Sequence, residues 1–229
     1  MSDVLGQAIY DHHHQARNHK LWIHNRYGDK EEMPVETYFR DEDDMPDLEW
    51  LALNECRGSV LDIGAGAGSH ALVLQQRGFD VAALEISPLA AAVMRERGVN
   101  NVIEADIFNY SAQRYDTLLL LMNGIGLTGT LQNLRMFLRH AKTLLLPGGQ
   151  LLFDSSDVAY IYEGDLPADR YHGEILYEYQ YKNKKSGWFS WLYADENTLL
   201  KLAAEEGWNA EVLLEDEFNQ YLVRLKPVS

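Results

Sequence analysis

The sequence predicts an α/β protein built on a doubly wound, mostly parallel β-sheet. From residue 59 onward, short apolar runs alternate with amphipathic segments of helical length, which is the pattern of a parallel sheet covered by helices on both faces. A glycine-rich segment joins the first apolar run to the first helical segment. At the end of the chain, a helix is followed by two strand-length runs that are close enough in sequence to form an antiparallel hairpin.

The elements follow one another regularly as far as residue 153. We expect strands at 60–63, 81–84, 102–104, 117–121 and 150–153, with helices at 69–77, 89–97 and 131–145 between them. Gly78 and Gly98 are expected to end the first two helices as left-handed caps. Pro147, Gly148 and Gly149 predict a turn after the third helix. A last helix is expected at 195–206, followed by strands at 210–214 and 220–225.

Two segments lie outside this pattern. Residues 1–58 predict an N-terminal cap, irregular and partly helical over 1–45 and helical from 47 to 56, placed before a domain at 59–229. Residues 157–193 predict an insertion, because eight aromatic residues fall within 23 positions there. Alternating side chains from Leu176 to Tyr181 indicate a β-hairpin that turns near residues 184–187.

The charge balance excludes several classes of partner. Lys and Arg number 20 against 35 Asp and Glu, so the net charge is −15, and residues 29–55 alone contribute eleven carboxylates against two bases. Such a surface repels nucleic acid and anionic membranes. The single Cys56 excludes an intrachain disulfide and a cysteine-rich metal site. Without a signal-like start or an apolar run of about 18 residues, a cytoplasmic location is expected.

The most informative segment runs from Val60 to Ser69. A strand enters three glycines at alternating positions, Gly64, Gly66 and Gly68, and then a helix begins. Glycines allow a sharp turn and bring a ligand close to main-chain N–H groups at the positive end of the helix. A dinucleotide loop is the alternative, but it requires Gly or Ala at position 69, where this chain has Ser.

Acidic residues follow the next two strands at the same edge of the sheet. Glu85 closes the second strand, where its carboxylate can accept both hydroxyls of a ribose. Asp106 follows the third strand and can accept the exocyclic amine of adenine, while a neighbouring backbone N–H serves a ring nitrogen. Taken alone, either residue could instead be a surface or loop-capping carboxylate.

With these features in order, the run from Val60 to Asp154 resembles the class I S-adenosylmethionine (SAM)-dependent methyltransferases. The resemblance includes the fourth-strand segment 115–123 and the turn 145–149 before a fifth strand. It implies a Rossmann-like seven-stranded sheet whose last strand is antiparallel. It also implies cofactor-binding roles for a set of residues at the strand ends: Asp62, Gly64, Ala65, Gly66, Gly68, Glu85, Ile86, Asp106 and Ile107.

The acceptor side is less defined by the sequence. Asn123, at the exit of the fourth strand, could contact donor or acceptor or simply satisfy the turn, and Asp154, after the fifth strand, could bind an acceptor or cap the next segment. Tyr177 and Trp191 represent the aromatic insertion, whose rings could enclose an apolar or cationic substrate or pack on the sheet. Tyr38 could cover the donor, and Arg40 could pair with the donor carboxylate.

Function follows from the donor chemistry. Methyl transfer from a sulfonium mainly requires alignment, so no triad or metal is obligatory, and no catalytic residue is assigned. His12, His13 and His14 are not expected to bind a metal, because neighbours on a helix point about 100° apart. We expect a methyltransferase acting on a small molecule. The alternatives are a non-catalytic protein that binds SAM or S-adenosylhomocysteine (SAH), and an NAD-dependent oxidoreductase.

Overall fold

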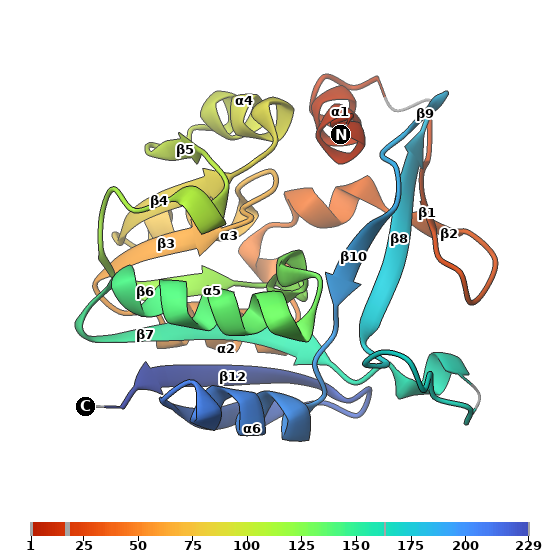
Figure 1. The fold of residues 1–229 in the computed structure, drawn as a ribbon. Helices are drawn as coiled ribbons and strands as arrows, with labels where there is room; N and C mark the ends of the chain where they lie inside the picture. The colour runs from red at the N-terminus through yellow and green to blue at the C-terminus, as the bar shows by residue number, and fades with distance from the viewer. Residues whose placement is uncertain (1, 17–18, 163, 229) are drawn as a thin grey trace.

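The central element of the fold is a seven-stranded sheet. The computed structural model describes residues 2–16, 19–162 and 164–228. In this sheet the strand order is β11-β12-β7-β6-β3-β4-β5 (Figure 1). The bounds are β3 Ser59–Ile63, β4 Asp80–Glu85, β5 Val102–Glu104, β6 Tyr115–Leu120, β7 Leu145–Ser156, β11 Trp208–Glu215 and β12 Gln220–Pro227. In this sheet β3, β4, β5, β6 and β7 are parallel, and β12 runs antiparallel to both β7 and β11, so the expected sheet is confirmed.

Helices cover both faces of this sheet because apolar side chains alternate along its strands. Leu118 and Leu120 of β6 join a core with α5 and α6, whereas Leu119 joins a separate core with α2, α3 and α4. Figure 1 shows α5 and α6 in front of the sheet and α2 behind it. The helices span α2 Asp47–Glu55, α3 Ser69–Gln76, α4 Pro88–Arg97, α5 Leu131–Thr143 and α6 Glu196–Glu205.

The N-terminal cap and the aromatic insertion form one second sheet. Its order is β10-β8-β1-β2, with β9 paired to β8. The strands are β1 Leu21–His24, β2 Glu31–Met33, β8 Glu174–Tyr181, β9 Lys184–Lys185 and β10 Phe189–Leu192. Trp22 lies opposite Gln180 in an antiparallel pair. The expectation of an irregular, partly helical region at 1–45 was therefore incomplete, since β1 and β2 obtain their strand structure by pairing with distant residues.

Shorter elements connect the two sheets. Helix α1 (Val4–His13) packs on α4 and β8, and its Val4, Ala8 and Ile9 share a small core with Leu21 and Tyr181. The 3₁₀ helices are η1 Val35–Phe39, η2 Glu42–Asp44, η3 Ile107–Asn109, η4 Gly124–Thr128 and η5 Ala159–Tyr162. None of the described helices is long and apolar enough to cross a membrane.

Two local expectations need correction. Strand β7 begins at Leu145 rather than at residue 150, and the expected turn at Pro147–Gly149 is an irregularity within it: Tyr115 pairs with Leu145 while Thr117 already pairs with Gln150. The insertion hairpin turns earlier than residues 184–187. Lys184 pairs back on Tyr181, and Lys182 takes the left-handed conformation with a φ of 53°.

The carboxyl ends of the parallel strands carry the loops of interest. In Figure 1 the strands β3, β4, β6 and β7 point toward the second sheet, so that β8 and β10 stand beyond their ends. Strand β10 packs against η4, which follows β6. In open α/β sheets ligands bind outside the carboxyl ends of the strands. The second sheet therefore closes the region in which a ligand of the first sheet would lie.

Candidate active site

The glycine loop takes backbone conformations that other residues rarely adopt. Gly64, Gly66 and Gly68 have φ values of 73°, 57° and 85°. Gly68 is the N-cap of α3, and a Cβ placed there would lie 2.9 Å from Val99 and 3.0 Å from Met94. At Gly66 the neighbour is the ring of Tyr38, 3.0 Å from such a Cβ. The three glycines are thus required by backbone conformation, by helix packing and by the close approach of Tyr38.

Glu85 lies directly against this loop. Its carboxylate is 9% exposed and accepts hydrogen bonds from the N–H groups of Gly66 and Ser87, both at 2.9 Å. Burial raises the pKa of Glu85, and the hydrogen bonds from Ser87 and Gly66 oppose that rise. The structure therefore brings together the loop and the acidic strand end that the sequence placed 19 residues apart.

The residues that the sequence predicts to contact adenine follow β4 and β5, the strand next to it in the sheet. Glu104 of β5 is in register with Glu85, so Asp106 follows at the same edge. Asp106 caps η3 by accepting from the N–H of Phe108 at 3.0 Å. Ile86 is 67% exposed, so its side chain is free to cover a flat ligand, whereas the side chain of Ile107 is buried in the core. Only the backbone of Ile107 is therefore available to a ligand.

A buried charge network lies beneath the loop. Asp62 is 2% exposed, and one of its carboxylate oxygens, Oδ2, has no hydrogen-bond partner. Burial raises its pKa to about 6, against the opposing effects of the His70 charge and the Ala71 N–H. His70 Nε2 donates to Glu49 at 2.8 Å, and Arg40 pairs with the other oxygen of Glu49. The structure thus places Arg40 on a buried carboxylate of its own chain.

Glu49 and His70 were not singled out by the sequence. Glu49 is one of eleven acids in residues 29–55, and His70 follows the glycine loop by only two positions. Both are buried, at 4% and 7% exposure, which is uncommon for charged groups unless they are paired. The one available signal was the polar side chain of His70 directly before the apolar run 71–74 of the helix.

At the exit of β6, Asn123 takes a left-handed conformation with a φ of 53°. Its N–H donates to Asp154 at 2.8 Å, and its side-chain oxygen accepts from the hydroxyl of Ser156 at 2.9 Å. Gln220 also donates to Asp154, at 2.7 Å. Asp154 is fully buried, and burial raises its pKa to about 6 against those two hydrogen bonds. In this structure Asp154 fixes the turn that presents Asn123.

Tyrosines from the cap and the insertion converge above these strand ends. Tyr38 lies over Gly66, and its backbone oxygen accepts from Ser69 at 2.8 Å. Its hydroxyl interacts with that of Tyr179, and the hydroxyls of Tyr177 and Tyr193 are 3.3 Å apart. Burial raises the pKa of Tyr38 well above its usual value and that of Tyr179 to about 12. These phenols are therefore neutral at physiological pH.

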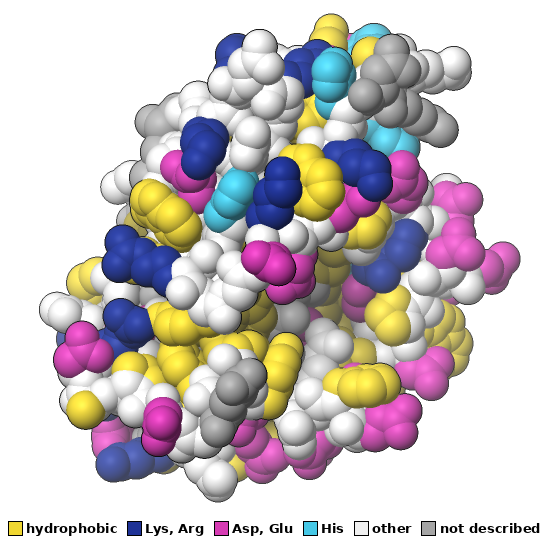
Figure 2. Space-filling model, turned by 90° about the vertical axis from the view of Figure 1, so that its right-hand side faces the viewer, with side chains coloured by type: hydrophobic (Ala, Val, Ile, Leu, Met, Phe, Trp, Pro, Cys, Tyr) yellow, Lys and Arg dark blue, Asp and Glu magenta, His cyan; other side chains and the backbone are white. Residues whose placement is uncertain are grey.

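A cavity of about 440 Å³ adjoins the tyrosines, and we call it the acceptor pocket. Its wall includes Asn123 after β6, Tyr177 of β8, Tyr193 after β10, and the loop between β1 and β2. Figure 2 looks onto this side of the molecule and shows a hollow near its centre with hydrophobic side chains around it. Trp191, which the sequence grouped with Tyr177 in the aromatic insertion, is not part of this wall; its ring packs on η4, where a Cβ on Gly126 would lie 1.9 Å from the indole nitrogen.

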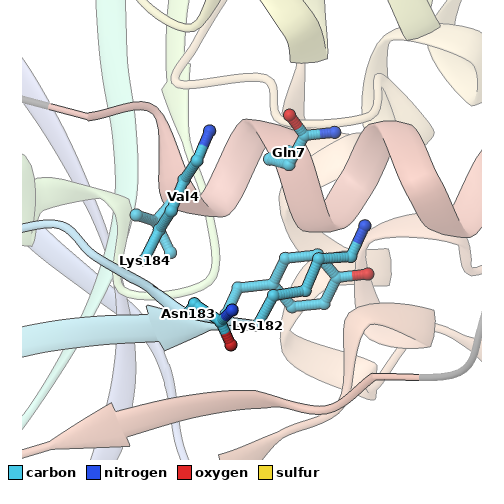
Figure 3. Close-up of a pocket in the computed structure, with 6 residues that line it drawn as sticks. Val4, Gln7, Lys182, Asn183 and Lys184 are labelled. Atoms are coloured by element: carbon cyan, nitrogen blue, oxygen red, sulfur yellow. The ribbon is translucent and has the colours of Figure 1, made fainter.

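A smaller cavity of about 290 Å³ lies elsewhere. Figure 3 shows that Val4 and Gln7 of α1 line it, facing Lys182 and Asn183 of the turn after β8 and Lys184 of β9. Its wall includes no residue of the glycine loop or of the strand ends. Nearby in sequence, His13 and His14 both face Glu96, and no metal-binding group of three or more side chains occurs within the described residues.

The fold and the strand-end groups define an α/β protein that binds a nucleoside-containing cofactor. A model of the methyltransferase domain family matches residues 38–212. A SAM-dependent methyltransferase from Bacteroides fragilis, solved in complex with SAH, is 40% identical, with a TM-score of 0.91 over 99% of this chain and 95% of that one. The chain therefore belongs to the methyltransferase domain family and is a SAM-dependent methyltransferase.

More distant structures share the fold. A protein from Pyrococcus horikoshii is 18% identical, with a TM-score of 0.62 over 79% of this chain and 88% of that one. A SAM-dependent methyltransferase from Clostridium acetobutylicum is 13% identical, with a TM-score of 0.59 over 82% and 94%. A search of curated proteins found no match. The family model and the 40% identical structure favour this class over the dinucleotide-dependent oxidoreductase.

The residues present fit a SAM-type cofactor. The unpartnered oxygen of buried Asp62 points to a missing donor, such as an ammonium group or a water that it holds. Glu85 offers a carboxylate in contact with the glycine loop, and exposed Ile86 offers an apolar surface next to it. Each feature suits one part of the cofactor: amino acid, ribose and adenine.

Proposed function

We propose that this methyltransferase transfers the methyl group of SAM to a small molecule held in the acceptor pocket. The observation that carries the proposal is the position of Asn123. It belongs both to the wall of the pocket and to the exit of β6, two strands from the acidic end of β4. A pocket of about 440 Å³ suits a small molecule.

The proposal assigns a role to each strand-end residue. Gly64, Ala65, Gly66 and Gly68 would line the methionine part of the cofactor, with Asp62 supporting its ammonium side. Glu85 would hold the ribose, and Ile86, Asp106 and the backbone of Ile107 would hold the adenine. Tyr38 would cover the donor, which agrees with its ring lying on Gly66. Arg40 would act indirectly, by keeping Glu49 and His70 in place beneath the loop.

Methyl transfer from SAM requires no particular catalytic side chain. SAM supplies a methyl group already activated by the positive sulfur. The chain excludes water with the second sheet, orients the acceptor against Tyr177 and Tyr193, and fixes Asn123 through Asp154. Alignment of this kind can supply much of the rate enhancement of a displacement reaction. The buried location of Asp154 gives it a positioning role.

The acceptors of related folds do not carry over directly to this chain. The structures that share this fold include a sugar N-methyltransferase from Streptoalloteichus, 18% identical with a TM-score of 0.59, and a glycopeptide N-methyltransferase, 17% identical with a TM-score of 0.57. At such identity they support the architecture, and the acceptor has to be argued from this chain's own pocket.

The test is formation of SAH from SAM by the full chain with a panel of small amines, alcohols, phenols and acids. SAH release above background with at least one compound is expected, and it should be lost in a Tyr177→Trp variant that fills the pocket. Donor affinity, measured by calorimetry with SAH, should be unchanged in that variant. Tight SAH binding with no turnover across the whole panel would instead support a binding protein.

A further inference from the structure

We infer that the acceptor pocket is built for a small amine. This inference rests on the proposed function and adds the chemical class of the acceptor. Five aromatic side chains line the cavity: Tyr27, Tyr160, Tyr177, Tyr193 and Phe218. Aromatic faces attract cations and pack against apolar bodies, but they do not stabilise a carboxylate or a phosphate.

The charged groups of the wall have one sign. Glu31 and Asp157 both line the cavity, and no Lys or Arg of the described residues does. Glu31 forms no salt bridge with any residue that the structure describes. Burial is the main cause that raises the pKa of Tyr177 and of Tyr193, and the negative charge of Glu31 adds a smaller rise to both. Glu31 lines the same cavity as both tyrosines, and its side chain is exposed at the start of β2.

Asp157 has partners, but they leave its charge largely available. It accepts from the N–H of Ala159 at 2.8 Å, and His172 lies 3.2 Å from the same carboxylate oxygen. Its side chain is 41% exposed. Arg170 does not line the cavity, but it contacts the lining residue Tyr27: its guanidinium is 5.7 Å from the centre of the ring and donates to the phenol oxygen. Among the described residues, this cation is therefore engaged by an aromatic side chain of the wall and adds no positive charge to the lining itself.

The inner end of the pocket supplies neutral hydrogen-bonding groups. The hydroxyls of Tyr177 and Tyr193 lie 3.3 Å apart and can accept from an amine N–H. Tyr193 and Tyr179 influence the pKa of Tyr38, which lies over the glycine loop. Tyrosines therefore extend from the carboxylates of the pocket to the donor side. An amine can be attracted by Glu31 and then held by phenol oxygens near the donor.

The reaction balances with no further co-reactant. The ammonium first releases a proton to water. The nitrogen lone pair then forms the N–C bond while the S–C bond breaks, and the bonding pair stays on the sulfur of SAH. The product leaves as a methylated ammonium, which can release its additional proton to water. A carboxylic acid acceptor would enter this pocket as an anion and meet two carboxylates.

The experiment uses the full chain with matched probes. Phenethylamine, phenethyl alcohol and phenylacetic acid share a phenyl ring on a two-carbon chain and differ in the terminal functional group. Ethanolamine, glucosamine and putrescine are amines with different carbon skeletons. Binding is measured by calorimetry on the SAH-loaded chain, and turnover is measured as SAH formed from SAM. We expect methylation of at least one amine and none of the acid, with the amine binding more tightly than its alcohol counterpart.

Two variants test the carboxylates, and one serves as control. Glu31→Gln and Asp157→Asn should each weaken amine binding by about tenfold, the scale of one lost charge interaction. Glu32→Gln is the matched control, because Glu32 is the next residue of β2 and pairs with Lys20. It should bind amines as the wild type does, and SAH affinity should be the same in all three variants.

The outcomes separate the two proposals. Methylation of the alcohol or acid with every amine silent would overturn the amine assignment and leave the proposed function intact. Amine methylation that is unchanged in both carboxylate variants would also overturn it. Silence of every probe, with SAH still bound, would overturn both proposals.

Discussion

The N–H of Gly66 donates a 2.9 Å hydrogen bond to the carboxylate of Glu85. This contact joins the glycine loop after β3 to the end of β4, so the two features that predicted a cofactor site support one another. Glu85 also accepts from Ser87, which begins the turn into α4. A single buried carboxylate thus fixes two loops before any ribose is bound. Four predictions follow from this and related contacts.

Replacing Glu85 should weaken the donor site. Glu85→Ala removes two hydrogen bonds to backbone and the proposed ribose acceptor, so SAH affinity should fall by about 1 to 3 kcal/mol, the scale of charged hydrogen bonds. Calorimetric titration with SAH measures the loss. Glu104→Ala is the matched control, since Glu104 is the register partner of Glu85 on β5 but its carboxylate is exposed. Equal affinity of the Glu85 variant and the wild type would remove the ribose assignment.

Adding one methyl group at Gly68 should destabilise the fold. In Gly68→Ala the new Cβ meets Val99 and Met94 at about 3 Å and the residue stays at a φ of 85°, so the free energy of unfolding should fall by about 3 kcal/mol. Gly148→Ala is the control, because Gly148 has a φ of 81° but no atom within 4 Å of an added Cβ. In Gly148→Ala the free energy of unfolding should fall by only about 1 kcal/mol. Urea unfolding measures both, and equal losses would mean that packing at Gly68 contributes nothing.

The buried carboxyl of Asp154 should make stability depend on pH. Its pKa is raised from 3.8 to about 6, so between those values the folded chain binds a proton that the unfolded chain has released. Stability from this group therefore falls as pH rises from about 4 to about 6 and is constant above. The stability advantage of wild type over Asp154→Asn should shrink by about 2 to 3 kcal/mol over that window. Urea unfolding at pH 4, 5, 6 and 7 tests it, and a constant difference would contradict it.

Breaking the charge network under the loop should be costly. Burial alone would raise the pKa of Glu49, but the His70 hydrogen bond and the charges of His70 and Arg40 lower it. Glu49→Gln leaves the Arg40 guanidinium without its carboxylate and takes the charged acceptor from the His70 ring in a buried place, so the free energy of unfolding at pH 7 should fall by about 3 kcal/mol. Glu42→Gln is the control, since Glu42 pairs with Arg77 but is 38% exposed, and it should cost less than about 1 kcal/mol. Equal losses in thermal or urea unfolding would argue against a role for burial.

The sequence predicted the glycine loop, the strand ends and the sheet because these depend on local patterns. Alternating glycines before a helix indicate a backbone with positive φ angles, and apolar runs such as 117–121 indicate a strand that is buried on both faces. The roles of Asn123 and Asp154 were left open, because each side chain could satisfy its own turn or bind a ligand. The structure shows that the two contact one another, which required β6 and β7 to be placed side by side.

What the sequence determined by itself was the glycine loop and the order of the strand ends, since their conformations are set by neighbours in the chain, and the resemblance of this pattern to the methyltransferases. The tertiary structure alone decided that the cap and the insertion form one sheet, since Trp22 and Gln180 pair across more than 150 residues and neither segment carries that information locally. It also decided that Arg40 pairs with Glu49, and that Tyr177, Tyr193 and Glu31 face one cavity. Pairing and burial of polar groups depend on which distant segments meet, and a single short segment does not encode that choice.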